Sequence, residues 1–403
     1  MVVGWRCAVC GTLVDIDTPL VFSCPNRTTD DPYHVLHLVT AGREPAPTEG
    51  QNPFDRYLDR LSVTAFAAHF GVDVGRLGEL IEPVVDDFVV TPFARSDRLS
   101  DEVGAHVWVK DETGQVAGSH KARHLVSTLA HLLVAEHVGL LPSRPPLAIA
   151  SCGNAALAAA TLARRVEWPI DVYVPTWMGD AFGGELDDLG ARVHRSERRA
   201  ADPPGDPAIH RFREAVADGA IPFTVQGPEN AWCLDSGRTI GWEIADAART
   251  AGVDLDRMVV QVGGGAFAAC VAAGLGSHTR LDTVQAEGCA PLAAAWHRLT
   301  PDDDPAVVWS RAMRTWDRPA SLADGILDDE TYDWVAVARA MRASRGRPIV
   351  AAERDIVAAH ELAAAAGFDA SPTGTAGLAG LLAVRDELDP HQDVAVVMSG
   401  VAR

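Results

Sequence analysis

Two lysines are the first residues of chemical interest, because the chain contains almost none. Among 35 Lys and Arg residues only Lys110 and Lys121 are lysines. An arginine stays protonated, whereas a lysine amine can lose its proton and condense with an aldehyde to form a Schiff base. Lys110 ends a strand-like run beside Asp111 and Glu112, which favours an ion pair. Lys121, in "GSHKAR", is therefore the candidate nucleophile, although taken alone it is equally well explained as a solvated helix cap.

A run of glycines forms a second candidate site. Gly263, Gly264 and Gly265 separate the strand-like "RMVVQV" from the apolar "AFAACVAAGLG". Glycines let the backbone approach an anion, and the start of a helix offers free N–H groups to a phosphate. The run is equally compatible with a plain tight connection. Glu287 lies near the spacing used for a nucleotide ribose, so a nucleotide-binding oxidoreductase remains an alternative.

A polar turn follows another predicted strand, "PLAIA". It consists of Ser151, Cys152, Gly153 and Asn154 and precedes the helical "AALAAATLARRV". Its hydroxyl, amide and backbone N–H donors suit a substrate carboxylate, and the plain alternative is an Asn-capped helix. The chain ends in "VVMSGVAR", where Ser399 follows another apolar strand.

Short Val/Ile-rich runs alternate with helical ones from about residue 90 onward. The predicted strands are 106–112, 146–150, 170–175, 257–262, 281–288 and 393–398, and the predicted helices are 121–139, 155–166, 266–276 and 375–388. This alternation predicts an α/β fold with parallel sheets covered on both faces. Ligands on such sheets bind beyond the carboxyl ends of the strands, which is where the polar turns fall.

The first 45 residues differ from the rest and resemble a small zinc ribbon. Cys7 and Cys10 are spaced as a metal-binding turn, and Cys24 and His34 follow as the remaining ligands. A ribbon that has lost its metal is the alternative. Residues 45–60, rich in Pro, Gly and charge, are predicted to be a linker.

Composition excludes several classes of function. The net charge of −20 disfavours binding to nucleic acid or to an anionic membrane. No apolar run reaches the roughly 18 residues of a membrane span, and the start lacks a signal-peptide layout. Seven cysteines, an odd number in a long chain, suggest a reducing interior and a cytoplasmic protein.

In their order along the chain, these motifs resemble the fold-type II pyridoxal phosphate (PLP) enzymes, including threonine synthase, threonine dehydratase, serine racemase and the tryptophan synthase β subunit. The matching motifs are Lys110-x-Glu112, Gly118-Ser119-x-Lys121-x-Arg123, Ser151-x-Gly153-Asn154, Gly237-x-Thr239-Ile240-x-x-Glu243-Ile244, Gly263-Gly264-Gly265, "SPTGTAGLAGL" and Ser399-Gly400. The resemblance implies two parallel-sheet α/β domains with the cofactor between them, and a homodimer. We expect a ribbon at 1–45, a large PLP-binding domain at 46–145 and 230–403, and a small domain at 146–229.

The resemblance also implies roles for individual residues. Lys121 would carry the Schiff base and move the α-proton of a small amino acid. The implied cofactor-binding residues are Lys121, His120, Asn154 at the 3-oxygen, the phosphate loop Gly263, Gly264, Gly265 and Ala266, and Ser399 at the pyridine nitrogen. The implied substrate-binding residues are Ser119, Ser151, Cys152, Gly153 and Asn154. A serine at the pyridine nitrogen makes the ring a weaker electron sink than a carboxylate would, which favours β- or γ-elimination or replacement over transamination.

Threonine synthase is the most similar subfamily, but the sequence lacks cationic residues that this subfamily uses to bind the phosphate of its substrate. Cys233 stands where that subfamily has an arginine, and Gly183, Gly184 and Glu185 replace a lysine-bearing helix start. A serine or threonine dehydratase and an O-activated serine β-replacement enzyme therefore remain alternatives, although Ala155 stands where dehydratases usually have His. A non-catalytic PLP-fold binding protein is the alternative from another class.

Overall fold

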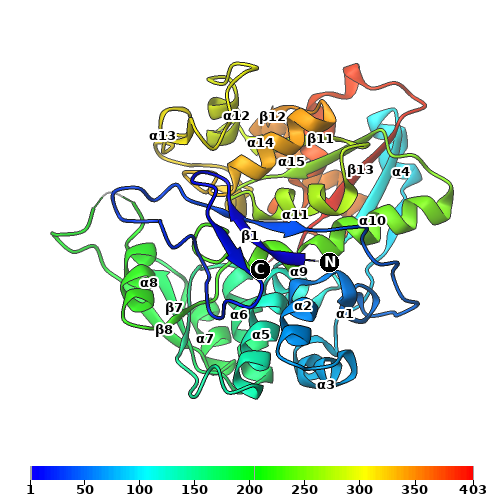
Figure 1. Cartoon of the computed structure of the whole chain (residues 1–403). Coiled ribbons are helices and arrows are strands. Elements are labelled where there is room, and N and C mark those ends of the chain that lie inside the picture. Colours follow the sequence, from blue (N-terminus) through cyan, green and yellow to red (C-terminus); the bar gives the residue numbers. More distant parts are fainter. Residues whose placement is uncertain (1, 204, 403) are drawn as a thin grey trace.

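The computed structural model describes residues 2–203 and 205–402, and three sheets organise this part of the chain (Figure 1). The largest has the strand order β12-β11-β10-β13-β5-β4. Its strands are β4 (Phe93–Arg95), β5 (His106–Asp111), β10 (Arg257–Gln261), β11 (Arg280–Ala286), β12 (Pro348–Ala351) and β13 (Asp393–Met398). All neighbours pair in parallel except β4, which runs antiparallel to β5 at the edge.

A second sheet is fully parallel, with the order β8-β7-β6-β9. Its strands are β6 (Leu147–Ala150), β7 (Ile170–Pro175), β8 (Arg192–Ser196) and β9 (Ile221–Pro222). Leu147, Ala148 and Ile149 are all completely buried, as expected for a strand covered on both faces. The predicted α/β fold class with two parallel sheets is confirmed.

Helices cover both faces of the six-stranded sheet. Successive strand residues alternate between two apolar clusters: Met258 and Val260 pack on one face, and Val259 packs on the other. The first cluster includes α10 (Arg238–Ala251), α11 (Ala266–Leu275) and α14 (Trp334–Ser344). The second includes α4 (Asp97–Val103), α15 (Glu353–Ala365) and α16 (Pro372–Ala383).

The four-stranded sheet shares one apolar cluster with helices from a long stretch of chain. These helices are α2 (Ser62–His69), α3 (Val74–Val85), α5 (Lys121–His137), α6 (Asn154–Arg165) and α7 (Asp180–Asp188), and α8 (Pro207–Ala217) also contacts the sheet. The division into domains at 46–145, 146–229 and 230–403 stays a prediction, and α5 packs with the smaller sheet.

Short elements complete the described chain. They are α1 (Pro53–Arg56), η1 (Leu58–Arg60), η2 (Val116–Gly118), α9 (Cys233–Ser236), α12 (Pro291–Trp296), α13 (Trp309–Ala312), η3 (Asp324–Ile326) and η4 (Arg385–Glu387). The linker predicted at 45–60 is wrong in its second half, because α1 and η1 bury Phe54 and Tyr57. The Tyr57 hydroxyl donates to Asp246 on α10 at 2.7 Å, so this segment belongs to the packed protein.

The N-terminal segment forms a three-stranded antiparallel sheet of β1 (Val2–Cys7), β2 (Leu13–Asp15) and β3 (Leu36–Thr40). It lies across the body of the molecule near α9 (Figure 1). Trp5, Cys7 and Cys24 share an apolar cluster with Ala231 and Trp232. Within the described residues, none of the helices is both long and apolar enough to cross a bilayer.

A buried ion network joins β5, α5 and α10. Lys110 forms an ion pair, as predicted, but its partner is the distant Glu243 and not the neighbouring Asp111 or Glu112, and it also donates to the Thr91 carbonyl at 2.7 Å. Arg123 binds Glu112 through Nε and Nη2 at 2.7 and 3.0 Å and also pairs with Glu243. Although burial favours the neutral acid, the charges of Arg123 and Lys110 lower the pKa of Glu243. The network therefore fixes the first turn of α5.

We expect Arg123→Met to lower the free energy of unfolding by about 3–5 kcal/mol, because it leaves two buried carboxylates short of a partner. The matched control is Arg76→Met, which removes an exposed pair with Glu79 and should cost less than about 1 kcal/mol. Urea unfolding of the cofactor-free chain measures both changes. Equal losses in the two variants would contradict the assigned importance of the network.

Candidate active site

Lys121 is the first residue of α5, at the carboxyl edge of the six-stranded sheet. Ser119 and Gly400 form an antiparallel bridge, and the His120 N–H donates to the Ser399 carbonyl at 3.0 Å. A Cβ added to Gly400 would lie 2.8 Å from Ser119 Cβ and 3.1 Å from Asn154 Nδ2. The structure thus brings together the GSHK turn, the end of β13 and the start of α6.

The surroundings of Lys121 favour the neutral form of its amine more than water does. Desolvation lowers the pKa of its ammonium, and the negative charges of Asp328 and Cys233 oppose this effect. Lys110 is held in the ion network, so of the two lysines only Lys121 is available for chemistry. A neutral amine is the form that attacks a carbonyl or removes a proton.

Three helices begin at this site without a side-chain cap. These are α5 after His120, α6 after Gly153 and α11 after Gly265. Other helices of the chain, such as α2, α7 and α15, also begin without a side-chain cap, so it is their common location that distinguishes these three starts. Uncapped N-termini present free N–H groups and a positive dipole end, which is the arrangement that binds carboxylate and phosphate groups.

The glycine loop fits a phosphate group in its backbone geometry. Gly265 has φ of 100° and precedes α11, and a Cβ on Gly263 would lie 2.3 Å from Asp328 Oδ2. Side chains are therefore excluded from the loop, which lets a bound group approach its backbone closely. Gly263, Gly264, Gly265 and Ala266 are the residues that would hold the phosphate of a bound cofactor.

Two acids that the sequence did not indicate, the half-buried Asp328 and the buried Asp333, face the same loop. Burial raises the pKa of Asp328 to about 6 against the opposing charge of Lys121, and a Gly264 N–H donates to this carboxylate. Burial raises the pKa of Asp333 to about 7, although its Oδ2 accepts from the Gly227 N–H at 3.0 Å. Asp333 Oδ1 is buried without a hydrogen-bond partner.

A histidine relay connects the residue before Lys121 to α9. His124 Nδ1 lies 3.1 Å from the Cys233 carbonyl, which can only accept, so Nδ1 carries the proton. Burial lowers the pKa of His124 to about 3, so its Nε2 accepts from His120 Nδ1 at 3.2 Å. The His120 ring lies against Phe267, with ring centroids 4.1 Å apart. His120 is thereby held between Lys121 and α11.

Ser399 is oriented by Gln261, at the end of the neighbouring strand. Gln261 Nε2 donates to Ser399 Oγ at 2.9 Å and to the Gly374 carbonyl at 3.0 Å. Because the Ser399 oxygen accepts this bond, its own hydrogen remains available for another acceptor. A buried hydroxyl in this position suits a ring nitrogen better than a carboxylate would if that nitrogen is to stay neutral.

The predicted metal ligands form one cluster in the N-terminal segment. Ligand atoms of Cys7, Cys10, Cys24 and His34 all lie within 4.8 Å of one another. His34 Nε2 lies 3.0 Å from Asp31 Oδ2, which orients the ring with Nδ1 toward the thiols. This donor set suits zinc.

Other features singled out by the sequence have structural explanations. Glu287 Oε1 accepts from the N–H of Glu353 at the start of α15, so it is used as part of the helix start.

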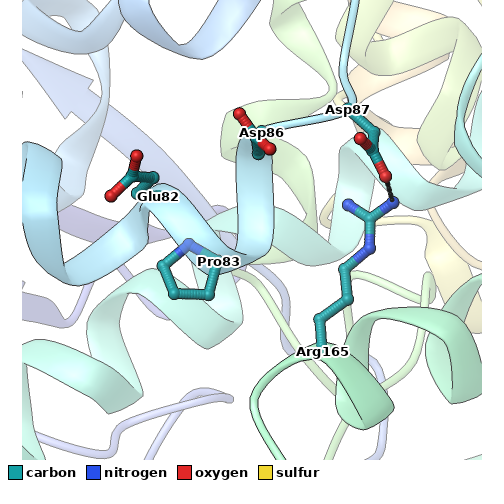
Figure 2. Close-up of a pocket in the computed structure, with 5 residues that line it drawn as sticks. All are labelled: Glu82, Pro83, Asp86, Asp87 and Arg165. Atoms are coloured by element: carbon teal, nitrogen blue, oxygen red, sulfur yellow. Dashed lines mark hydrogen bonds and ion pairs between the residues drawn. The ribbon is translucent and has the colours of Figure 1, made fainter.

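A surface hollow beside α3 is lined by Glu82, Pro83, Asp86, Asp87 and Arg165 (Figure 2). Arg165 pairs with Asp87 at 2.7 Å, and the hollow contains none of the candidate site residues.

Fold and site together define an α/β protein that can hold a phosphate-bearing aldehyde beside a single reactive lysine. Sequences of the family described as "Pyridoxal-phosphate dependent enzyme" match residues 85–400. The chain belongs to this family, which confirms the resemblance, and pyridoxal phosphate is its cofactor.

Individual relatives are distant. Threonine synthase of Mycobacterium leprae (strain TN) is 26% identical over 319 residues, covering 75% of this chain and 80% of its own length. A biosynthetic L-threonine dehydratase of Lactococcus lactis subsp. lactis (strain IL1403) is 22% identical over 319 residues, covering 77% and 70%. The solved structure of maize serine racemase has a TM-score of 0.64 at 18% identity, covering 81% of this chain and 93% of the other. At this identity the racemase shows a shared fold.

We expect Asp328→Asn to tighten binding of pyridoxal phosphate to the cofactor-free chain at pH 8. With a pKa of about 6 the carboxylate is ionised at pH 8, and neutralising it beside a phosphate costs up to about 2.7 kcal/mol, or roughly 100-fold in affinity. The gain should shrink to a few-fold at pH 6, where the native acid is already half protonated. Fluorescence titration with the cofactor measures both values.

The matched control is Asp302→Asn, which alters an exposed carboxylate in the loop between α12 and α13 and should change the affinity little at either pH. An Asp328→Asn affinity equal to that of the native chain at pH 8 would contradict a phosphate at the glycine loop beside Asp328.

Proposed function

We propose that the chain is a PLP-dependent lyase or synthase that eliminates or replaces a β- or γ-substituent of a small amino acid. The observation that carries the proposal is a lysine with a lowered pKa, Lys121, at the same edge of the fold as the uncapped starts of α6 and α11. Threonine synthase and threonine dehydratase among the relatives support the same class of reaction.

Each part of the site has a task in this reaction. The bound cofactor supplies an electrophilic carbonyl and an electron sink. Lys121 would hold the cofactor through its aldehyde carbon with loss of water and, once freed by the substrate amine, would take and return the proton at the substrate α-carbon. Ser151, Gly153 and Asn154, with Ser119 nearby, grip the substrate carboxylate at the start of α6. Ser399 would offer its hydroxyl hydrogen to the ring nitrogen, and this contact would leave that nitrogen without a full charge.

The charges around the site favour a leaving group that is not a phosphate. Partial burial and the charges of Asp206 and Asp324 raise the pKa of the Cys152 thiol. Asp328 acts on Lys121, and Cys233 is a buried thiol where an arginine would bind a phosphate. A second dianion would be repelled by these acids. A hydroxyl, acetyl or amine leaving group fits better, so a serine or threonine β-eliminase is the favoured member of the class.

A non-catalytic binding protein is the second candidate. It is motivated by the loss of cationic residues at Gly183, Gly184 and Cys233. The retained Lys121, with its depressed pKa, and the oriented Ser399 favour an enzyme. The homodimer and the cytoplasmic location predicted from the sequence also belong to this proposal.

Reduction with borohydride tests the attachment point. We expect cofactor-loaded protein to gain one pyridoxyl group, found by mass spectrometry on the peptide that carries Lys121. Lys121→Ala should lose this label and its visible absorption band, since Lys110 is held by Glu243 and Thr91. A label on Lys110, or retention of the label in Lys121→Ala, would contradict the assignment of Lys121.

A substrate panel tests the reaction. We expect L-serine, L-threonine or O-acetylserine to release keto acid and ammonia at least about tenfold faster than O-phosphohomoserine releases phosphate, because one missing anion contact costs over 1 kcal/mol. Parallel assays of keto acid, ammonia and phosphate give the ranking. Threonine formed rapidly from O-phosphohomoserine would overturn the inference from Cys233. Shifts of the visible band without any product would favour the binding protein.

A further inference from the structure

The Cys/His cluster in the N-terminal segment has the dimensions of an occupied zinc site. Tetrahedral zinc, with bonds of about 2.3 Å to sulfur and 2.0–2.1 Å to nitrogen, separates two sulfurs by about 3.8 Å and a sulfur from a nitrogen by about 3.5 Å. Cys10 and Cys24 Sγ are 3.7 Å apart, and His34 Nδ1 is 3.5 Å from both Cys7 Sγ and Cys24 Sγ. A disulfide would bring two sulfurs to about 2.0 Å, and all seven cysteines are free.

Contacts beyond the ligands complete the site. The Cys10 N–H and the Asn26 amide each point at a ligand sulfur, at 3.5 Å from Cys7 Sγ and Cys10 Sγ respectively. Asp31 holds the far nitrogen of His34. Such second contacts orient thiolate and imidazole ligands around a metal. The chain from residue 16 to 35 contains no helix or strand, so bound zinc would supply most of its organisation.

The ligand Cys24 lies between two contacts to one segment, residues 227–234. Before it, the Phe22 carbonyl accepts from the Ala231 N–H at 2.7 Å, and the Phe22 ring lies 4.5 Å from that of Trp232. After it, Arg27 binds both carboxylate oxygens of Glu229 at 2.8 Å. Arg27 also donates to the Pro228 carbonyl at 3.0 Å. The N-terminal ribbon therefore contacts residues 227–234 through residues that precede and follow Cys24 in the sequence.

The same segment contacts the Lys121 site at both of its ends. At one end, the Gly227 N–H binds Asp333, which faces the glycine loop. At the other end, the Cys233 carbonyl accepts from His124, which in turn holds His120. Cys233 also packs against Ala266, the first residue of α11.

We propose that zinc bound by Cys7, Cys10, Cys24 and His34 holds residues 227–234 in place as one wall of the Lys121 site. The metal takes no part in the reaction, and its effect passes through Phe22 and Arg27 to the segment. This assignment goes beyond the proposed reaction, and its tests require no turnover.

The first test is metal content. We expect about one zinc per chain in protein purified without added metal, and replacement by Co²⁺ should give the visible absorption of tetrahedral cobalt–thiolate. Cys10→Ser, which alters the exposed ligand, should lower zinc content at least about tenfold after dialysis. Cys289→Ser is the control, because Cys289 is a buried thiol outside the cluster. A native chain that binds neither zinc nor cobalt would overturn the proposal.

The second test is amide hydrogen exchange followed by mass spectrometry. We expect removal of zinc to speed exchange in peptides covering 227–234 on the order of tenfold and to leave peptides of β6 and α6 unchanged. Arg27→Met removes a contact to residues 227–234 without altering a metal ligand. This variant should keep its zinc and still show faster exchange in the same peptides. If zinc removal leaves the exchange rate of 227–234 unchanged, or speeds exchange equally along the whole chain, zinc does not hold this segment in place. Either result would overturn the proposal even if zinc binds.

Discussion

The buried ion network of Lys110, Glu112, Arg123 and Glu243 is the interaction on which the site depends. It ties the end of β5 to the first turn of α5 and to the middle of α10. Lys121 lies two residues before Arg123, so the guanidinium that anchors this turn also fixes where the amine emerges. The network is fully buried, so its carboxylates need both cations present. The position of Lys121 therefore depends on the balance of charges in this buried network.

Electrostatics in the site show two opposed tendencies. Three uncapped helix starts give the site a positive potential that attracts anions. Asp328 and Asp333, however, lie next to the glycine loop that would bind a phosphate, and their negative charges oppose that binding. Burial raises the pKa of Asp328 to about 6 and that of Asp333 to about 7, which brings both titrations close to physiological pH. A protonated carboxyl can donate a hydrogen bond to a phosphate, so the same side chains can either oppose or assist binding. Which occurs depends on a proton, and this makes cofactor retention sensitive to pH.

Much of the fold and part of the site could be predicted from sequence. β7 matches its apolar run, and the GSHK turn, the glycine loop and the metal cluster lie at the predicted residues, because each combines local pattern with a local chemical need. Asp328 and Asp333 could not be predicted, since they lie in an acidic stretch that is indistinguishable from a solvated loop. Gln261 could have been suspected from the sequence, because it is a polar residue within a strand that is otherwise typical of a buried one. Long-range packing, which sequence pattern does not report, brings these side chains to the site.

The two lysines persist in an arginine-rich chain for different physical reasons. Lys110 is buried, and its compact ammonium binds one carboxylate and the Thr91 carbonyl within a space already shared with the Arg123 guanidinium. A second planar guanidinium would need more room and more acceptors. Lys121 needs the opposite property, because an arginine there could carry charge but could neither release its proton nor bond to a carbonyl carbon. One position requires a compact cation held in an ion pair, and the other requires an amine that can lose its proton.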